Sequence, residues 1–257
     1  MDILPTLSLN FLSSVLWRIA ELVPVLGKRR RFGRIFGSAA SRGALHVAVG
    51  ALVPPVGCDE KGNVIERVLS KKGVPGSLFS AMQVVSCCEV RAATYLIESA
   101  ALNAGHVSIL STDEDIATKE QLSFVSFGLA DNLKTLQLLA NAANSFVDFE
   151  SQVLVSKLSR KLLAQNVAPV RLDHGLILKI RPSSNPEQTW ICCAGLHEWG
   201  TSGAAWYLAN RWRDLHAKFG TKPFAVIVKV KWGHDESAEP ILMAGTPEEI
   251  ERHVREA

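Results

Sequence analysis

The sequence predicts an α/β domain with a mainly parallel sheet and helices on both faces, preceded by an amphipathic N-terminal helix. After Gly43, short apolar runs alternate with segments of helical periodicity, the order typical of strands connected by helices. Before Gly43, one apolar stretch is followed by a basic run. We therefore expect a membrane- or partner-binding segment at residues 1–38 and the α/β domain at residues 39–257.

Composition excludes several classes of protein. The chain has 257 residues, of which 47% are hydrophobic and 21% charged, enough for a substantial core. Residues 1–45 hold seven Lys or Arg against two acids, whereas the remainder holds 21 against 23. Because phosphate contacts need a basic face, the slightly acidic body argues against nucleic acid as a partner. The five cysteines show no CxxC spacing, which indicates a reducing cytoplasm and no disulfide framework.

The N-terminal segment combines an apolar face with a basic cluster. Residues 7–27 are largely apolar, but Arg18, Glu21 and Pro24 interrupt them, which argues against a spanning helix. Helical spacing instead gathers the apolar side chains on one side. The expected membrane contacts are Trp17, Lys28, Arg29, Arg30, Arg31 and Arg34, with Phe32 and Phe36 at the interface.

This segment has two alternative roles. The chain is expected in the cytoplasm, peripherally attached at the inner face of the membrane. In the alternative, the helix packs on the domain or on a second subunit of a homo-oligomer.

The α/β body divides into expected strands and helices by its periodicity. Strands are expected at residues 46–52, 106–111, 122–127, 174–180, 189–194 and 224–232. The fourth and fifth of these are close enough to form a hairpin. Helices are expected at residues 88–103, 132–144 and 201–219, and after Thr246 and Pro247 near the C-terminus. Residues 54–76, rich in Pro and Gly, are expected to form a long loop.

Two strand-to-helix turns are candidate ligand sites, because ligands of open α/β sheets bind beyond the carboxyl ends of strands. In the first turn, Gly128 allows a tight bend, Asp131 or Asn132 can cap the helix, and Thr135 lies in its first turn. The alternative is an ordinary capped turn.

The second turn contains Gly195, Gly200 and Gly203, with Thr201 as the expected N-cap. These glycines suit a loop whose backbone approaches a phosphate or ribose. Their spacing is not G-x-G-x-x-G, and no P-loop lysine follows.

Acid–base chemistry has one candidate pair, His197 and Glu198, adjacent in the second turn. Glu89 and Arg91 are a further polar pair, for which a salt bridge on a helix surface is expected. A serine hydrolase is excluded by the lack of a G-x-S-x-G motif. Cys192 and Cys193 lie in an apolar strand, which disfavours a cysteine nucleophile. No set of residues has metal-ligand spacing, so no metal is expected.

Three segments carry a resemblance to a known class of domain: RFGRIFG before the first strand, FVSFGLADNLKT, and WICCAGLHEWGTSGAAWYL. Their order resembles that of uncharacterised Rossmann-like domains of bacterial conflict and signalling systems. The resemblance covers most of residues 30–235 and implies nucleotide sensing or processing in bacterial defence, often beside a membrane or effector segment. Fold alone does not fix the function.

The sequence leaves three functions open. The first is a binding domain for a nucleotide or a nucleotide-derived signal such as an NAD-like ligand, tethered by its N-terminal helix to a membrane or partner. Its ligand would be held by Gly128, Asp131, Asn132, Thr135, Gly195, Gly200, Thr201 and Gly203. The second is an enzyme that cleaves a nucleotide or its glycosidic bond, with His197 or Glu198 as acid or base. The third is a membrane-associated scaffold without a ligand.

Overall fold

The computed structural model describes most of the chain after residue 24. The described residues are 25–52, 84–106, 108–129, 131–166 and 171–256, together with the backbone of four short strands between residues 57 and 80. Trp17 and the rest of the predicted apolar segment before residue 25 lie outside them.

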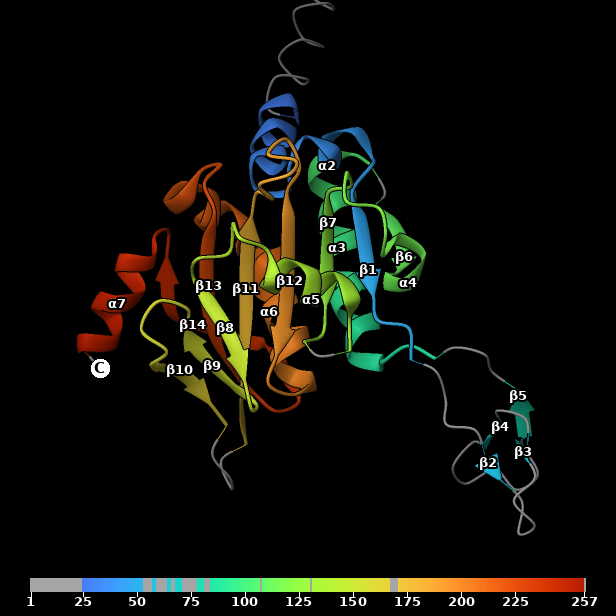
Figure 1. Ribbon diagram of the computed structural model, residues 1–257. Coiled ribbons are helices and arrows are strands. Elements are labelled where there is room, and N and C mark those ends of the chain that lie inside the picture. The colour runs from blue at the N-terminus through green and yellow to red at the C-terminus, as the bar shows by residue number, and fades with distance from the viewer. Residues whose placement is uncertain are drawn as a thin grey trace, which may run out of the picture.

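A seven-stranded mixed sheet forms the centre of the molecule (Figure 1). Its strands, in spatial order, are β14 (His234–Ala244), β13 (Phe224–Lys231), β11 (Leu172–Ile180), β12 (Trp190–Gly195), β7 (Phe124–Phe127), β1 (His46–Val49) and β6 (Ile109–Thr112). The expected parallel pairing is confirmed for β12, β7, β1 and β6. The other three strands are antiparallel to their neighbours. The reason is that β11–β12 and β13–β14 are hairpins, whose short connections reverse the chain.

Helices cover both faces of the sheet, as the sequence predicts. One face is covered by α3 (Cys87–Ala104), α6 (Glu198–Phe219), the helix at residues 25–36 and α2 (Ser38–Arg42). The other face is covered by α5 (Leu133–Ala140), α7 (Pro247–Glu256) and a small sheet of β8 (Val147–Glu150), β9 (Val153–Ser156) and β10 (Leu162–Gln165). The short helix α4 (Asp113–Ile116) follows the edge strand β6.

The two cores follow from the alternation of side chains along each strand. In β12, Ile191 and Cys193 join the core under α3 and α6, whereas Trp190, Cys192 and Ala194 join the opposite core. Successive residues of a strand point to opposite faces, and both faces of this sheet are covered. Central strands are therefore mostly apolar on both faces, with a few buried polar residues such as Ser126 in β7 and Asp173 and Lys179 in β11.

The stretch expected to be a long loop contains two short antiparallel ladders. The first pairs β2 (Gly57–Cys58) with β3 (Val64–Ile65), and the second pairs β4 (Val68–Ser70) with β5 (Leu78–Ser80).

The helix at residues 25–36 packs into the domain core through one face. Phe32, Ile35 and Phe36 are fully buried, and the ring of Phe32 contacts both Phe36 and the edge of Trp212. The expectation that Phe32 and Phe36 lie at a membrane interface is therefore wrong. Their spacing of three and four residues places them on one helix face, and that face meets α6.

The basic residues of the same helix divide into two groups. Lys28 donates a hydrogen bond to the carbonyl of Leu102, and Arg29 donates one to the carbonyl of Ser41. Arg30, Arg31 and Arg34 are exposed. Among the described residues, no helix combines the length and apolarity needed to cross a membrane.

Candidate functional site

The carboxyl ends of the parallel strands converge on one pocket. The chain passes from β1 to β6 on one side of β1 and returns to β7 on the other side, so the connections diverge between β1 and β7. Ligands of open α/β sheets bind at such a switch point. A pocket of about 390 Å³ lies here, between the first turns of α3 and α6.

The pocket unites residues from four parts of the chain. They are Ser86, Cys88 and Glu89 before and in α3, Gly128, Leu129 and Asp131 after β7, Phe149 and Gln152 of the β8–β9 hairpin, and Gly195, Leu196, His197, Glu198 and Thr201 after β12. Both Gly-rich turns predicted from the sequence therefore face the same cavity. Six predicted residues line it: Gly128, Asp131, Gly195, His197, Glu198 and Thr201.

Two predicted ligand residues of the first turn lie outside the pocket, in structural roles. Asn132 is the N-cap of α5, as expected, because its side-chain oxygen accepts the N–H groups of Lys134 and Thr135. Its amide also donates to the carbonyl of Ala48 in β1. The hydroxyl of Thr135 is buried against that of Ser126, 2.8 Å away. Both residues fasten α5 to the sheet.

Two predicted glycines of the second turn also lie outside the pocket. A methyl group on Gly200 would overlap the carbonyl of His174, and one on Gly203 would lie 2.6 Å from a methyl carbon of Val230. Both glycines therefore let α6 pack directly on β11 and β13.

A buried carboxylate fixes the start of α6. Asp173 accepts hydrogen bonds from the backbone N–H groups of Gly200 at 2.6 Å, His174 at 2.7 Å and His197 at 3.2 Å. The side-chain amide of Asn166 donates a further bond at 2.7 Å. A carboxylate at a helix N-terminus is stabilised by the free N–H groups and the helix dipole. Asp173 therefore occupies the position that a phosphate takes in many α/β proteins.

The expectation that Thr201 caps this helix is wrong. α6 begins at Glu198, with His197 as the N-cap residue. The N–H bonds to Asp173 start the helix three residues earlier than predicted. Thr201 lies inside it, and its hydroxyl accepts the N–H of Gly195 at 2.9 Å.

A second buried carboxylate, that of Asp113, binds backbone N–H groups at the start of α5 in the same way. Asp113 accepts the N–H of Leu133 at 2.7 Å and that of Ala51 at 2.9 Å. Together, Asp113 and Asn132 satisfy the first three N–H groups of α5. Neither Asp113 nor Asp173 was recognised as a site residue from the sequence. The one available signal was a charged residue within or directly after an apolar strand.

Glu89 is the least solvated acid of the pocket. Its side chain is 1% exposed and accepts the N–H of Gly50 at the end of β1. Burial, reinforced by the negative charges of Asp131 and Asp113 and opposed by the Gly50 bond, raises the pKa of Glu89 to about 8. The carboxyl group is therefore mostly protonated at pH 7. The expected surface salt bridge with Arg91 is wrong, because Arg91 pairs with Asp235 at 3.3 Å.

Glu89 and Asp131 flank the backbone of Gly128. A methyl group on Gly128 would lie 2.6 Å from Oδ1 of Asp131 and 2.7 Å from Oε1 of Glu89. Gly128 also has a φ of 79°, which a residue with a side chain rarely adopts. Glycine therefore lets the two carboxyl groups approach the same point of the pocket wall.

His197 and Glu198 are exposed at the opposite wall of the pocket. The ring of His197 meets the Trp232 ring edge-on at 6.4 Å. A cysteine nucleophile is disfavoured, as expected: burial raises the pKa of the Cys192 thiol to about 12 and that of Cys193 well above its usual range.

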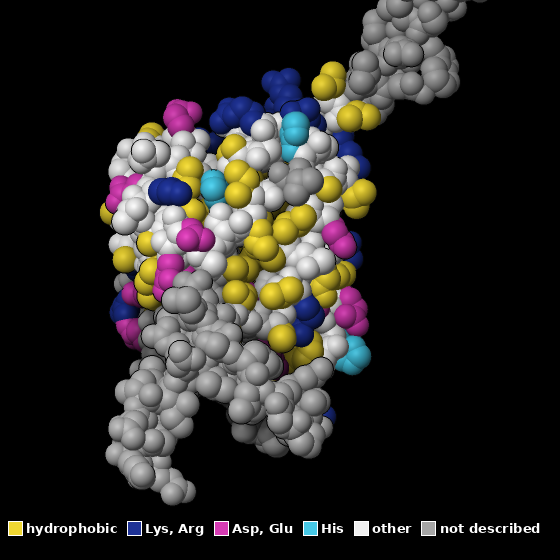
Figure 2. All heavy atoms as spheres, turned by 90° about the vertical axis from the view of Figure 1, so that its right-hand side faces the viewer, with side chains coloured by type: hydrophobic (Ala, Val, Ile, Leu, Met, Phe, Trp, Pro, Cys, Tyr) yellow, Lys and Arg dark blue, Asp and Glu magenta, His cyan; other side chains and the backbone are white. Residues whose placement is uncertain are grey.

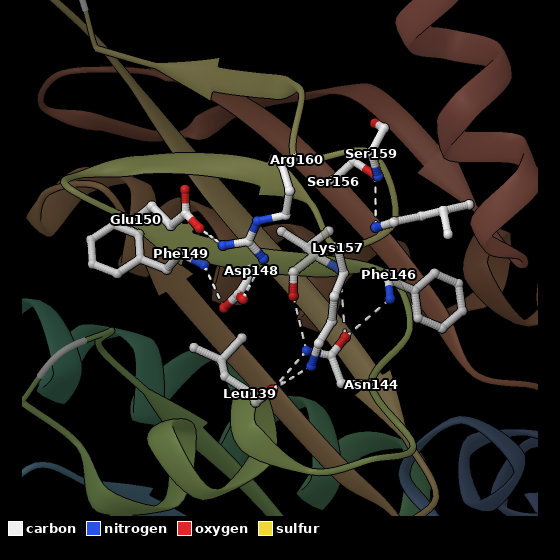
Figure 3. Close-up of polar contacts among 12 residues, drawn as sticks. Leu139, Asn144, Phe146, Asp148, Phe149, Glu150, Ser156, Lys157, Ser159 and Arg160 are labelled. Atoms are coloured by element: carbon white, nitrogen blue, oxygen red, sulfur yellow. Dashed lines mark hydrogen bonds and ion pairs between the residues drawn. The ribbon is translucent and has the colours of Figure 1, made fainter.

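The β8–β9 hairpin brings Phe149 and Gln152 to the pocket, and α5 holds it in place. Asn144 donates to the carbonyls of Leu139 and Val147, and Lys157 donates to that of Leu139 (Figure 3). Arg160 lies between Asp148 and Glu150 and pairs with both. The bonds of Asn144 and Lys157 connect the last turn of α5 to the two ends of the hairpin, and the ion pairs of Arg160 lie within the hairpin.

A larger cleft of about 460 Å³ lies between α3, α6 and the helix at residues 25–36, with Lys28, Glu98, Trp206 and Arg213 in its lining. It lies away from the carboxyl ends of the strands. The pocket at the switch point is the better candidate, because the buried carboxyl group of Glu89 lies in its lining together with Asp131 and Glu198. In the part of the chain that the structure describes, no cluster of His, Cys, Asp or Glu could hold a metal ion.

No family model, no curated protein and no solved structure matches this chain. A functional assignment therefore rests on the geometry of the pocket. The similarity of its Gly-rich turns to Rossmann-like domains stays a prediction from the sequence.

Replacing Asp173 by Asn tests the role of the buried carboxylate. The substitution keeps the shape but puts a side-chain amide donor among backbone donors, so we expect a loss of about 2–4 kcal/mol in the free energy of unfolding. Asp214→Asn is the control, because Asp214 is 65% exposed and, among the described residues, forms only a 3.9 Å ion pair with Arg211. Urea denaturation measures both. A loss below about 1 kcal/mol for Asp173→Asn would contradict the assigned role.

The raised pKa of Glu89 predicts that the stability of the protein depends on pH. Its folded pKa lies above its unfolded value, so its contribution to stability is largest below about pH 4.5 and falls as the pH rises toward 8, by up to about 1.4 kcal/mol per pH unit. Glu89→Gln removes this titration. The variant should therefore gain stability relative to the wild type between pH 5 and 8, measured by denaturation at several pH values. Glu98→Gln, on the exposed face of the same helix, should show no such trend, and parallel curves for Glu89→Gln and wild type would exclude a raised pKa.

Proposed function

We propose that the pocket binds the nucleoside part of a nucleotide-derived ligand, within a Rossmann-like domain. The observation that carries this proposal is the composition of the pocket lining. It includes the carboxyl groups of Glu89 and Asp131 and the side chain of Phe149, and among the described residues it contains no Lys or Arg. The chemistry of the lining favours hydroxyl groups and an aromatic ring over an anionic group.

The carboxyl groups suit the sugar. Dinucleotide-binding domains use an acidic side chain to accept hydrogen bonds from ribose hydroxyls. Asp131 and Glu198 can accept such bonds, and protonated Glu89 can also donate one. The pocket volume of about 390 Å³ lies within the range of small-ligand sites.

The β8–β9 turn suits the base. Phe149 offers a ring face for stacking, and the Gln152 amide offers a donor and an acceptor to a base edge. The two turn residues, Ser151 and Gln152, have φ values of 45° and 66°. Glycine and asparagine are preferred in such two-residue turns. A glutamine kept in this conformation, with its side chain at the pocket, supports a role in binding.

The phosphates of the ligand would lie outside the pocket. The N–H groups of Gly195, His197, Gly200 and Leu133 donate to side chains of the protein itself. They are therefore not available to an anion in this arrangement, and the acidic lining would repel one.

A second candidate function, cleavage of an N-glycosidic bond, is favoured by the protonation of Glu89. In this reaction Glu89 donates its proton to the leaving base as the C1′–N bond breaks and its electron pair moves to the base. The Asp131 carboxylate stabilises the positive charge that develops on the ribosyl group. Water then adds to C1′ and returns a proton to Glu89, as in glycosidases that use two carboxyl groups.

The binding proposal is tested with the full chain, nucleosides, nucleotides, NAD and cyclic dinucleotides. A selective ligand should raise the melting temperature, and additional phosphates on the same nucleoside should raise affinity less than threefold. Gln152→Gly should weaken binding about tenfold while leaving the melting temperature of the free protein unchanged or higher, because glycine suits the turn. Ser151→Gly is the matched control, since Ser151 does not line the pocket. No stabilisation by any compound would contradict the proposal.

Cleavage is tested by product analysis with the bound ligand. If the pocket is catalytic, Glu89→Gln should lower kcat at least 100-fold with little change in KM, because the loss falls on the proton donor. The wild-type rate should fall as the pH rises above about 8. Binding without detectable release of the base would support the binding function and exclude the enzymatic function.

A further inference from the structure

A basic cleft lies at the opposite end of the sheet, beside the helix at residues 25–36. Its volume is about 320 Å³, and its lining comes from that helix, α2 and the turn before it, the connection between β11 and β12, and Thr221 after α6. Arg30, Arg34 and Arg181 line it against a single carboxyl group, that of Glu187. The cleft therefore joins guanidinium groups from distant parts of the sequence in one concave site.

The three guanidinium groups form few interactions within the described part of the protein. Among the described residues, none of them forms an ion pair with a carboxylate. Arg181 donates one hydrogen bond, to the carbonyl of Pro186 at 3.3 Å. Lys28 and Arg29, by contrast, are engaged by backbone carbonyls. Three unpaired guanidinium groups in one cleft are suited to a multivalent anion, since each can bind phosphate oxygens in a bidentate manner.

The rest of the cleft supplies hydroxyl groups, and a buried lysine lies behind it. Four hydroxyl residues line it: Ser38, Ser41, Thr189 and Thr221. Behind Arg34, buried Lys179 donates to the Arg34 carbonyl at 3.0 Å. Burial and the charge of Arg181 lower the pKa of Lys179 to about 7, so an anion in the cleft would favour its charged form.

The same helix carries an exposed apolar group. Val25 and Leu26 are 58% and 57% exposed at its first described turn, on the N-terminal side of Arg30 and Arg34. Figure 2 shows Lys and Arg side chains gathered at this end of the molecule. Exposed aliphatic side chains beside a basic cluster are typical of proteins that attach to an anionic membrane surface.

We propose that this cleft binds the phosphate monoester headgroup of an anionic lipid, with Arg30, Arg34 and Arg181 as its ligands. The proposal restricts the membrane contact to a defined cleft: Arg181 joins it, and Lys28 and Arg29 serve the internal packing of the helix. It does not depend on the nucleoside pocket at the other end of the sheet.

The test measures binding of the full chain to vesicles of two compositions in a neutral lipid background. One contains phosphatidic acid and the other contains phosphatidylglycerol at the same surface charge. Apolar contacts and general electrostatic attraction then contribute equally to both affinities, so they cancel in the ratio of the two affinities. We expect at least fivefold stronger binding to phosphatidic acid. Arg181→Gln and Arg34→Gln should each remove most of this preference.

Two controls separate a specific cleft from a diffuse basic surface. Arg31→Gln changes an exposed arginine of the same helix outside the cleft, and Arg211→Gln changes one on α6. Both should keep the preference. Equal binding to the two vesicles, or equal losses in Arg31→Gln and Arg181→Gln with unchanged melting temperatures, would overturn the proposal. Binding of inorganic phosphate that Arg181→Gln abolishes, without any vesicle preference, would overturn the lipid assignment.

Discussion

The fold at the carboxyl end of the parallel strands depends on buried carboxyl groups that accept hydrogen bonds from backbone N–H groups. Asp173 binds the first turn of α6, Asp113 binds the first turn of α5, and Glu89 binds the end of β1. Each bond connects a strand end or helix start to a segment distant in sequence. Because unpaired N–H groups at buried helix ends are costly, these acids determine where the helices begin.

This arrangement also determines the character of the pocket. The backbone N–H groups of Leu133, His197 and Gly200, at helix ends of the kind that commonly bind phosphate in α/β proteins, donate to the protein's own acids. The remaining lining is acidic and partly apolar, with Phe149 and Gln152 contributed by a hairpin on the other face of the sheet. The glycines of the two turns serve close packing, as at Gly200 and Gly203, and the approach of two carboxyl groups, as at Gly128.

The linings of the two pockets at opposite ends of the sheet differ in the sign of their charged residues. The carboxyl end of the parallel strands carries Glu89, Asp131 and Glu198, whereas the other end carries Arg30, Arg34 and Arg181. The core between them includes Phe32 and Phe36, so the basic helix is joined rigidly to the sheet by packing. A ligand at one end and a surface contact at the other would thus act on the same body.

The sequence by itself determined the alternation of strands and helices, the hairpin of β11 and β12, the capping of α5 by Asp131 or Asn132, and the two Gly-rich turns as the candidate site. These features depend on local periodicity and turn chemistry, which act over a few residues. Tertiary structure alone decided that Asp113 and Asp173 replace an external anion, that Glu89 is buried beside Asp131, and that Phe32 and Phe36 enter the core. It also brought Arg181 to Arg34. The physical reason is that burial and charge pairing arise between segments far apart in the chain, and no local pattern records which of them meet.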